Sequence, residues 1–453
     1  MAHESLQARL ERYDKPVDML RNGPHKLFSL AYARQHSNWR DEQAAWMQTA
    51  VLFDQSNHMN ETYIKGPDVV RLLSDTGINS FAKFGRNKAK QFMVCGYDGN
   101  LIGTCVLFGL EDGEVSLVGP SACANWVQYQ AEIGGYDVEI TWDRRTADSD
   151  APRRTYRYEI EGPLAKNILE KAHGGPLPEM KFFGMSEFTL GGAPVRALKH
   201  TMAGAPGDDN MGLEIWGPVE DAQRCLEALL TAGEEFGLVR GGALAYYSSG
   251  IESGYLSQPV PAIYTDERMK AYREWLPGDG YEAKFSIGGS FASDDLEDYY
   301  RTPWDMDYGH ILKFDHDFIG REALEAVKDE PHSRKVWLRW NDDDVTRVIR
   351  SSLFDPRGTG AKFLDYPLSR YARVQFDQVL AHDELVGIST LCGYTVNVGG
   401  FFSLAMVDQE TAVDGKEVTV VWGEENGGTG KLGVEQHVQF EIRATVSTKT
   451  LVG

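Results

Sequence analysis

A short pattern recurs three times along this chain: an alternating strand, a Gly-Pro pair and then a helix with one apolar face. It occurs as YIKGPDVVRLLSD (63–75), YRYEIEGPLAKNILEK (156–171) and LEIWGPVEDAQRCLEALL (213–230). Proline is compatible with the first turn of a helix, so Gly-Pro marks the point where a strand gives way to a helix. The three copies are unevenly spaced, which excludes a solenoid and indicates α+β modules of related build.

The C-terminal part of the chain follows a different pattern. From about Arg334 onward, short apolar segments such as KVWLRWN, FFSLAMVD and KEVTVVWG are separated by Gly, Asn and Asp turns, which is typical of a β-barrel or sandwich. A chain of 453 residues is also too long for one ordinary hydrophobic core. We therefore expect an α+β region over residues 1–330 and a separate all-β domain over residues 331–453.

The balance of charge excludes some kinds of partner. The chain has 46 Lys and Arg against 67 Asp and Glu, which gives a net charge of −21. A protein with this net negative charge repels the phosphate backbone of nucleic acids. Its basic residues also form no continuous run, and we therefore expect no nucleic-acid partner. No segment approaches the roughly 20 apolar residues of a membrane span, and MAHESLQARLERYDKP lacks the apolar core of a signal peptide. We therefore expect no membrane association and a cytoplasmic location.

Neither the cysteines nor the histidines match a metal site, and no metal is predicted. The five cysteines are dispersed without CxxC spacing, which fits a reduced cytoplasm rather than a zinc site or a disulfide framework. His310 and His316 stand near acidic residues in GHILKFDHDF, but their spacing matches no standard metal motif, so we expect loop or capping roles. GEENGGTGK lacks the Ser or Thr that follows the lysine of a phosphate-binding loop, so we expect a tight turn there.

Three segments place polar side chains directly after a strand or inside an apolar one. FDQSNHM contains Gln55 and His58, GLEIWGP contains Glu214, and LAYYSSGIESGYL contains three tyrosines and Glu252. An acid among apolar residues is costly to bury without a partner, whereas ligand sites combine apolar walls with a few polar groups. A carboxylate also suits the paired N–H donors of an amidine-like edge, which a pterin presents. Taken singly, each residue is better explained as an exposed strand residue or a cap, and the residues alone do not name the ligand.

Several segments together resemble the folate-binding aminomethyltransferase family, which includes the glycine-cleavage T-protein. They lie between about residues 40 and 430 and include VLFDQSNHM, YIKGPDVVRLLSDTGINS, YEIEGPLAKNIL, GLEIWGP, GIESGYL, HDFIGREAL and VGISTLCGYTVNVGGFFSLAMVD. SNWRDEQAAW, YEAKFSIGGSF and WGEENGGT are most similar to the branch of tetrahydrofolate-dependent vanillate and syringate O-demethylases. The resemblance implies a T-protein-like cloverleaf of three domains: two interleaved α+β folate-binding domains and a C-terminal β-barrel. It also implies tetrahydrofolate as the cofactor and a methoxylated aromatic small molecule as the substrate, in the breakdown of lignin-derived aromatics.

The same resemblance assigns roles to six residues. It implies catalysis by Tyr246 and His58, and cofactor binding by Glu214, Gln55, Tyr255 and Glu252. We interpret Tyr246 as the acid that donates a proton to the departing phenolate, because both hydroxyls have pKa values of about 10. If LAYYSS is a strand, the neighbouring Tyr247 points to the opposite face and is structural.

The chain departs from the family at three places. Gly103-Thr104 stand where the T-protein has paired aspartates, which argues against aminomethyl transfer. Pro120 stands where the demethylases carry an arginine for the substrate carboxylate, so recognition of a benzoate is in question. A pocket tyrosine of that branch is replaced near Phe28-Ser29, where Tyr32 is a candidate substitute.

Two other functions stay open. One is demethylation of an S-methyl sulfonium or N-methyl amine, whose leaving group is neutral and would make Tyr246 dispensable. The other is a folate-binding regulatory protein without turnover, which the loss of the acid at Gly103-Thr104 would permit. In any of these roles we expect a monomer or a homodimer.

Overall fold

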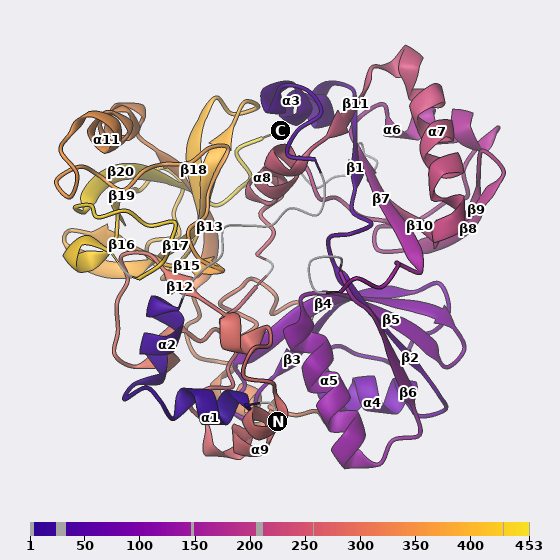
Figure 1. The fold of residues 1–453 in the computed structure, drawn as a ribbon, viewed down its shortest axis with the longest axis horizontal. Coiled ribbons are helices and arrows are strands. Elements are labelled where there is room, and N and C mark those ends of the chain that lie inside the picture. The colour runs from indigo at the N-terminus through magenta and orange to yellow at the C-terminus, as the bar shows by residue number, and fades with distance from the viewer. Residues whose placement is uncertain are drawn as a thin grey trace.

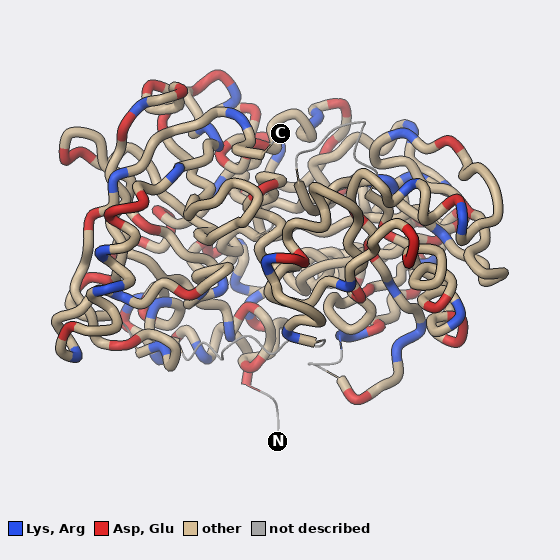
Figure 2. Tube along the Cα trace, turned by 90° about the horizontal axis from the view of Figure 1, so that it is seen from above, with Lys and Arg blue, Asp and Glu red and all other residues tan. Residues whose placement is uncertain are grey.

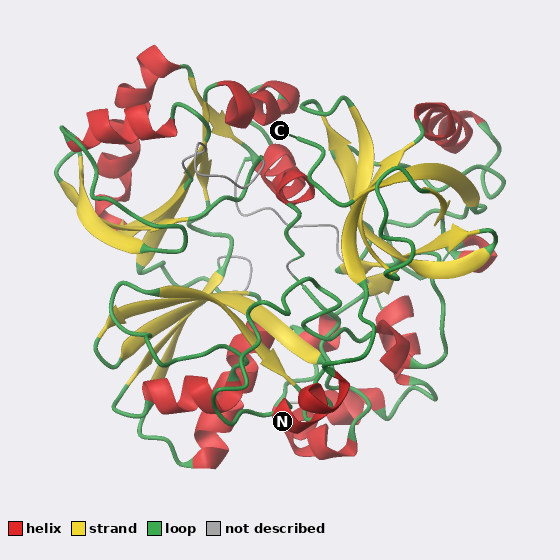
Figure 3. Cartoon of the chain, turned by 180° about the vertical axis from the view of Figure 1, so that it is seen from behind, coloured by secondary structure: helices red, strands yellow, loops and turns green. Residues whose placement is uncertain are grey.

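The computed structural model describes residues 4–23, 33–145, 149–204, 212–256, 258–428 and 430–452. Its strands form three large sheets, which build three lobes around a common centre (Figure 1). Figure 3 gives the view from behind and shows most helices on the outer sides of these sheets. The arrangement confirms the predicted α+β cloverleaf.

The first lobe is a five-stranded antiparallel sheet with the strand order β3-β4-β5-β2-β6. Its elements are β2 (Asn60–Lys65), α4 (Val69–Thr76), β3 (Ala89–Cys95), β4 (Leu101–Glu111), β5 (Glu114–Gly119), α5 (Ser121–Gly134) and β6 (Glu139–Asp143). Helix α5 packs on β4, and Phe92, Leu107 and Trp126 are buried in the core beneath it.

The second lobe is a six-stranded sheet with the order β11-β1-β7-β10-β9-β8. Its elements are β1 (Ala50–Asp54), β7 (Thr155–Glu161), α6 (Ala165–His173), β8 (Met185–Leu190), β9 (Ala193–Lys199), β10 (Leu213–Pro218), α7 (Ala222–Gly233) and β11 (Leu238–Gly241). One face buries apolar side chains such as Leu52, Ile160 and Ile215 in a core shared with α6 and α7. Because side chains alternate along a strand, the charged residues of β7 and β10 lie on the opposite face.

The third lobe is a closed β-barrel. Strands β17, β16, β19, β20, β13 and β18 pair in this order, and β18 pairs back to β17. The elements are β13 (Arg334–Trp340), α11 (Asp342–Phe354), β14 (Leu368–Ser369), β16 (Asp377–Ala381), β17 (Glu384–Thr395), β18 (Gly400–Val407), β19 (Glu417–Trp422) and β20 (Phe440–Ser447). The barrel confirms the all-β prediction. The boundary at residue 330 stays a prediction. One short pairing crosses it, between β12 (Ile287–Gly288) and β15 (Val374–Gln375).

The remaining helices join the lobes. They are α1 (Leu6–Leu10), α2 (Pro16–Asn22), α3 (Trp39–Gln48), α8 (Ala243–Ser253), α9 (Lys270–Trp275) and α10 (Arg321–Val327). Short 3-10 helices cover Val219–Asp221, Glu234–Phe236, Glu267–Met269, Glu282–Lys284, Leu296–Tyr299 and Glu425–Gly427. Helix α8 lies near the centre of the molecule, between the second lobe and the barrel (Figure 1).

The strand–Gly-Pro–helix units form as predicted. Gly66 and Gly162 end β2 and β7 with φ angles of 149° and 127°, which side chains rarely adopt. A Cβ at Gly162 would also lie 2.7 Å from the Thr49 carbonyl oxygen, so glycine permits the close approach of the two segments.

The segment around Tyr246 is helix α8, so the condition of a strand, under which Tyr247 would point to the opposite face, is not met. The helix begins after Gly242 and ends at Gly254, whose φ of 74° is that of a left-handed helix cap. Two aromatic residues in sequence favour a strand locally, but the alanines of the segment favour a helix and almost the whole segment is buried between two lobes.

Two loop predictions are also confirmed. His316 contacts the Asp315 carboxylate at 2.8 Å through Nδ1 and the Gly77 carbonyl oxygen at 3.0 Å through Nε2, which ties a loop to the first lobe. Asn426 has a φ of 58° in the tight turn that follows β19.

Charged residues of both signs are distributed along the described part of the chain. Figure 2 shows Lys and Arg mixed with Asp and Glu along this trace. Within the described residues, every helix is too short or too polar to cross a bilayer.

Candidate active site

The face of the second sheet that turns away from α6 and α7 carries a buried ion pair at its centre. Arg157 Nη1 donates to Glu214 Oε1 at 2.5 Å, and Nη2 donates to Glu61 Oε1 of the first lobe at 3.0 Å. The guanidinium carbon lies 5.0 Å from the ring centroid of Phe108 and 4.9 Å from that of Trp216. Burial alone would lower the pKa of Arg157, but the two carboxylates raise it above its ordinary value. Arg157 therefore fixes Glu214 where the first and second lobes meet.

A histidine lies next to this ion pair. We call Glu159, His200 and Glu214 the Glu214 row. His200 Nε2 lies 3.1 Å from Glu159 Oε2 and 3.3 Å from Glu214 Oε2. Burial alone would raise the pKa of Glu214, but Arg157 and His200 lower it to about 2. Burial and the neighbouring Glu159 raise the pKa of Glu161 well above the ordinary value. The row therefore keeps a permanent carboxylate at Glu214.

The same row could also be considered a metal site. One ligand atom from each of Glu159, His200 and Glu214 lies within 4.8 Å of the others. However, the Arg157 guanidinium is already paired with Glu214, and a second cation there would meet its charge at close range. We assign no metal to this row.

A histidine and two tyrosines form an aromatic cluster next to the row. His58 follows β1, and its Nδ1 lies 3.0 Å from the hydroxyl of Tyr247 on α8. Its ring centroid lies 5.1 Å from that of Tyr246 and 5.5 Å from that of Tyr247, both edge-on. Tyr246 also packs edge-on against Phe53 of β1. Because the segment is a helix, both tyrosines reach His58, and the prediction that Tyr247 points to the opposite face is wrong.

The surroundings keep His58 neutral. Burial, followed by the positive charges of Arg145, Arg370 and Arg373, lowers the pKa of His58 to about 3. At neutral pH the ring therefore has one N–H donor and one acceptor nitrogen.

Tyr246 keeps its proton for a similar reason. The side chain is 4% exposed, and burial raises the pKa of Tyr246 well above its ordinary value, with further contributions from Tyr247, Glu159 and Glu214. Its hydroxyl is therefore a proton-bearing group next to the Glu214 row.

Two further predicted residues lie near this cluster. Gln55 is buried and its Nε2 donates to the sulfur of Met202 at 3.3 Å, a weak acceptor. Tyr255 is 40% exposed, and its hydroxyl accepts from Gln91 Nε2 at 3.2 Å. Tyr255 therefore offers one ring face to a ligand while its hydroxyl is held by the first lobe.

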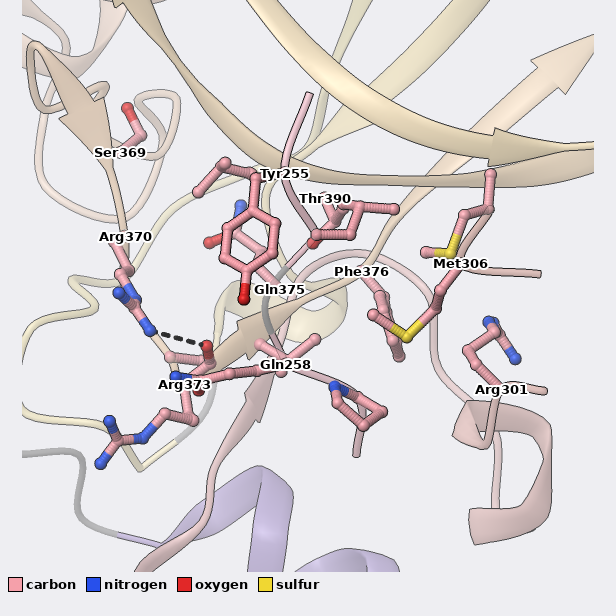
Figure 4. Close-up of a pocket in the computed structure, with 16 residues that line it drawn as sticks. Tyr255, Gln258, Arg301, Met306, Ser369, Arg370, Arg373, Gln375, Phe376 and Thr390 are labelled. Atoms are coloured by element: carbon pink, nitrogen blue, oxygen red, sulfur yellow. Dashed lines mark hydrogen bonds between the residues drawn. The ribbon is translucent and has the colours of Figure 1, made fainter. Parts of the chain in front are cut away.

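A pocket opens beside Tyr255 (Figure 4). Its cavity is about 80 Å³, which suits one end of a ligand rather than a whole cofactor. The lining residues are Tyr255, Leu256, Gln258, Pro259, Arg301, Met306, Ser369, Arg370, Ala372, Arg373, Val374, Gln375, Phe376, Thr390, Leu391 and Met406.

Glu252, the remaining residue expected to bind the cofactor, is buried among donors of α3 and the barrel. Its Oε2 accepts from the Trp46 indole at 2.7 Å, and its Oε1 accepts from Asn397 Nδ2 at 3.0 Å and from the Thr395 hydroxyl. Both oxygens are thus occupied by donors of α3 and of the barrel. Through these bonds the buried Glu252 connects α8 to α3 and to the barrel.

The positions at which the chain departs from its family are partly visible. Pro120 directly precedes α5, and Thr104 is buried within β4. Tyr32 and Phe28-Ser29 lie outside the described residues.

Three residues of the site were missed in the sequence. Arg157 and Glu159 occupy alternate positions of YRYEIE, a pattern that can be interpreted as an exposed strand face, and His200 lies in no recognisable motif. The sequence carries no signal for them, because this face of the strand is covered by the first lobe, whose Glu61 and Phe108 contact Arg157.

The chain matches a family model described as "GCVT N-terminal domain" over residues 9–260. It is 43% identical to a syringate O-demethylase of Sphingobium sp. (strain NBRC 103272 / SYK-6), over 98% of this chain and 95% of that protein. It is 29% identical to a sesamin methylene transferase of Sinomonas sp. (strain No.22), over 84% of this chain and 81% of the relative.

A solved structure is also similar, the glycine cleavage system aminomethyltransferase T from Bartonella henselae. It matches with a TM-score of 0.59 and 17% sequence identity, over 91% of this chain and 89% of the other. At this identity the likeness shows the fold alone, and it confirms the fold that the sequence resemblance implied.

Proposed function

Because the chain belongs to the GCVT aminomethyltransferase family, we propose that it transfers the methyl group of a methoxylated aromatic compound to tetrahydrofolate. The products are 5-methyltetrahydrofolate and a phenol, so the enzyme is an aryl O-demethylase. The likeness to a syringate O-demethylase supports this reaction. The observation that carries it is the contact of one neutral histidine, His58, with both Tyr246 and Tyr247.

Glu214, Gln55 and Tyr255 are the residues proposed to hold tetrahydrofolate. A carboxylate oxygen can accept two hydrogen bonds. After the bonds of Glu214 to Arg157 and His200, each of its oxygens keeps capacity for one N–H donor of a pterin edge. The Glu214 carboxylate, which can accept these two hydrogen bonds, therefore fits the N–H edge of the cofactor. When bound, tetrahydrofolate supplies the nitrogen that accepts the methyl group.

Tyr246 is proposed to protonate the leaving oxygen. When the bond between the methyl carbon and the aryl oxygen breaks, both electrons stay on that oxygen. A neutral hydroxyl that meets the developing charge lowers the barrier. The raised pKa of Tyr246 ensures that its proton is present at neutral pH.

His58 is proposed to add a second donor. In this proposal the Tyr247 hydroxyl, 3.0 Å from Nδ1, is the donor, so the ring proton of the neutral imidazole lies on Nε2. That N–H can then bond the methoxy oxygen and hold it against Tyr246. Orienting the ether in this way also aligns the methyl group for displacement.

The test is a mass-spectrometric assay for 5-methyltetrahydrofolate. The protein is incubated with tetrahydrofolate and, in separate reactions, with vanillate, syringate, neutral methoxyphenols, a methyl sulfonium and an N-methyl amine. Product from the methoxyarenes supports the proposal. Product from the sulfonium or the amine alone contradicts it, and so does folate binding without product from any donor.

A further inference from the structure

Three arginines line the pocket of Figure 4, and none of the described residues that line it is acidic. The chain as a whole carries a net charge of −21, and charges of both signs are mixed over its surface (Figure 2). A concave site lined by one sign of charge concentrates ligands of the opposite sign. The pocket is therefore built for an anion.

Two of the arginines come from one short segment between β14 and β15. Arg370 Nη2 donates to the Arg373 carbonyl oxygen at 3.1 Å, and this bond holds the Arg370 guanidinium in the pocket (Figure 4). The Arg373 guanidinium carbon lies 5.0 Å from the centroid of the Tyr281 ring. Arg301 lies on the other side of the pocket in Figure 4 and 5.1 Å from the Phe376 ring centroid.

The charges of Arg370 and Arg373 act on the aromatic cluster of His58, Tyr246 and Tyr247. Arg370 and Arg373 both contribute to the lowered pKa of His58, after burial and Arg145. Burial, followed by the charge of Arg373, lowers the pKa of Arg370 itself to about 10. Helix α8, which carries Tyr246 and Tyr247, contacts β14, the strand directly before Arg370, and Tyr255 just after α8 lines the pocket. The pocket therefore lies next to the aromatic cluster.

We propose that Arg370 and Arg373 bind the carboxylate of an aromatic acid, while its methoxy oxygen faces His58 and Tyr246. This inference rests on the proposed function and assigns the residues that hold the acid group of a methoxylated benzoate. In such an acid the aromatic ring holds the carboxylate and the methoxy group apart at a fixed distance. One site for each group therefore sets the position of the methyl carbon.

The planar forks of arginine suit this task, because a guanidinium binds a carboxylate through two parallel hydrogen bonds. The cavity of about 80 Å³ admits the carboxylate end of such a molecule. Carboxylate recognition would then have moved from the start of α5, where Pro120 stands, to the barrel lobe.

The test compares a charged substrate with its neutral analogue. Steady-state kinetics are measured with syringate and with 2,6-dimethoxyphenol, which lacks the carboxylate. In Arg370→Gln and Arg373→Gln, the KM for syringate is expected to rise about tenfold or more, because a charge-assisted bond is lost. The KM values for the phenol and for tetrahydrofolate should change less than about twofold. Arg373→Lys should restore part of the syringate affinity, because it keeps the charge.

Arg350→Gln serves as the matched control, since Arg350 is exposed on α11 of the same lobe. Thermal unfolding of each variant shows whether it folds. A similar loss with syringate and with the phenol would overturn the proposal, because it would indicate a structural role. A rise confined to the KM for tetrahydrofolate would also overturn it, because the arginines would then serve the glutamate carboxylates of folate.

Calorimetric titration of the folded protein with syringate separates this inference from the reaction. Binding that weakens about tenfold or more in both Gln variants supports the arginine site even if no methyl is transferred. Unchanged binding in both variants overturns the site even if the wild type demethylates syringate.

Discussion

The hydroxyl of Tyr247 lies 3.0 Å from Nδ1 of His58, while the neighbouring Tyr246 packs edge-on against the same imidazole. The two tyrosines are adjacent in α8, so the helix brings two tyrosine side chains to one histidine. The Tyr247 hydroxyl is proposed to set which nitrogen of His58 carries the proton. The Tyr246 hydroxyl is proposed to act on the substrate.

Because the two tyrosines have different proposed roles, removing each hydroxyl should lower kcat by a different factor. Tyr246→Phe removes the proposed acid, and we expect kcat with syringate to fall about 10²-fold or more. Tyr247→Phe leaves the acid and removes only the partner of His58 Nδ1, so we expect a loss of about tenfold. The measurement is single-turnover formation of 5-methyltetrahydrofolate.

Tyr13→Phe is the control for this pair, because Tyr13 is an exposed tyrosine on the surface. Wild-type turnover in a folded Tyr246→Phe variant would exclude the acid role. A larger loss in Tyr247→Phe than in Tyr246→Phe would transfer that role to Tyr247.

The lowered pKa of His58 predicts a direction for the effect of pH on stability. The pKa of His58 is about 3 in the folded protein and about 6.5 in the unfolded chain. Between these values the unfolded chain binds more protons, so the free energy of unfolding falls as the pH falls from about 6.5 towards 3.

His58→Gln removes this contribution. The variant should therefore lose less stability than the wild type when urea unfolding at pH 7 is compared with pH 5. In the wild type, kcat should show no inflection near pH 6.5. An inflection there that His58→Gln abolishes would mean that His58 titrates at its ordinary pKa.

Local patterns in the sequence predicted much of the fold. Gly66-Pro67 and Gly162-Pro163 mark real strand–helix junctions, because the constraint on the backbone is local. The helix α8 could not be predicted in the same way. Tyr246-Tyr247 favour a strand locally, and burial of the helix between two lobes decided otherwise.

The site was predicted less completely for a related reason. Glu214 stands out as an acid in an apolar strand, but its partner Arg157 comes from β7 and its partner His200 directly follows β9. Only the strand order brings them together. Glu252 is also a buried acid in a family motif, and its carboxylate accepts from Trp46 of α3 and from Asn397 of the barrel lobe, which lie far from it in the sequence.

Glu252 is accordingly predicted to matter for stability and not for folate affinity. Glu252→Ala leaves the buried donors of Trp46 and Thr395 without their acceptor, and each buried donor left unpaired costs about 1–3 kcal/mol. We expect a lower urea midpoint and an unchanged Kd for tetrahydrofolate in calorimetry, provided that the variant folds. If the Kd rises about tenfold while the urea midpoint is unchanged, Glu252 is a cofactor ligand after all.

The pair of Glu214 and Arg157 supports the last prediction. Removing one partner of a buried ion pair costs about 3–5 kcal/mol, because the other charge is left without compensation. Glu214→Gln should therefore lower the free energy of unfolding, although Glu61 still pairs with Arg157. Since the pKa of Glu214 is lowered to about 2, its contribution is present above pH 4.5 and disappears as the pH falls towards 2.

Glu61→Gln is the matched control, because Glu61 binds the same guanidinium from the first lobe. Both variants should lose stability, but only Glu214→Gln should weaken tetrahydrofolate binding, by about tenfold or more, since only Glu214 is proposed to meet the pterin edge. Equal weakening in both variants would mean that folate depends on the position of Arg157 rather than on the carboxylate of Glu214. The comparison therefore separates a direct ligand from the ion pair that holds it in place.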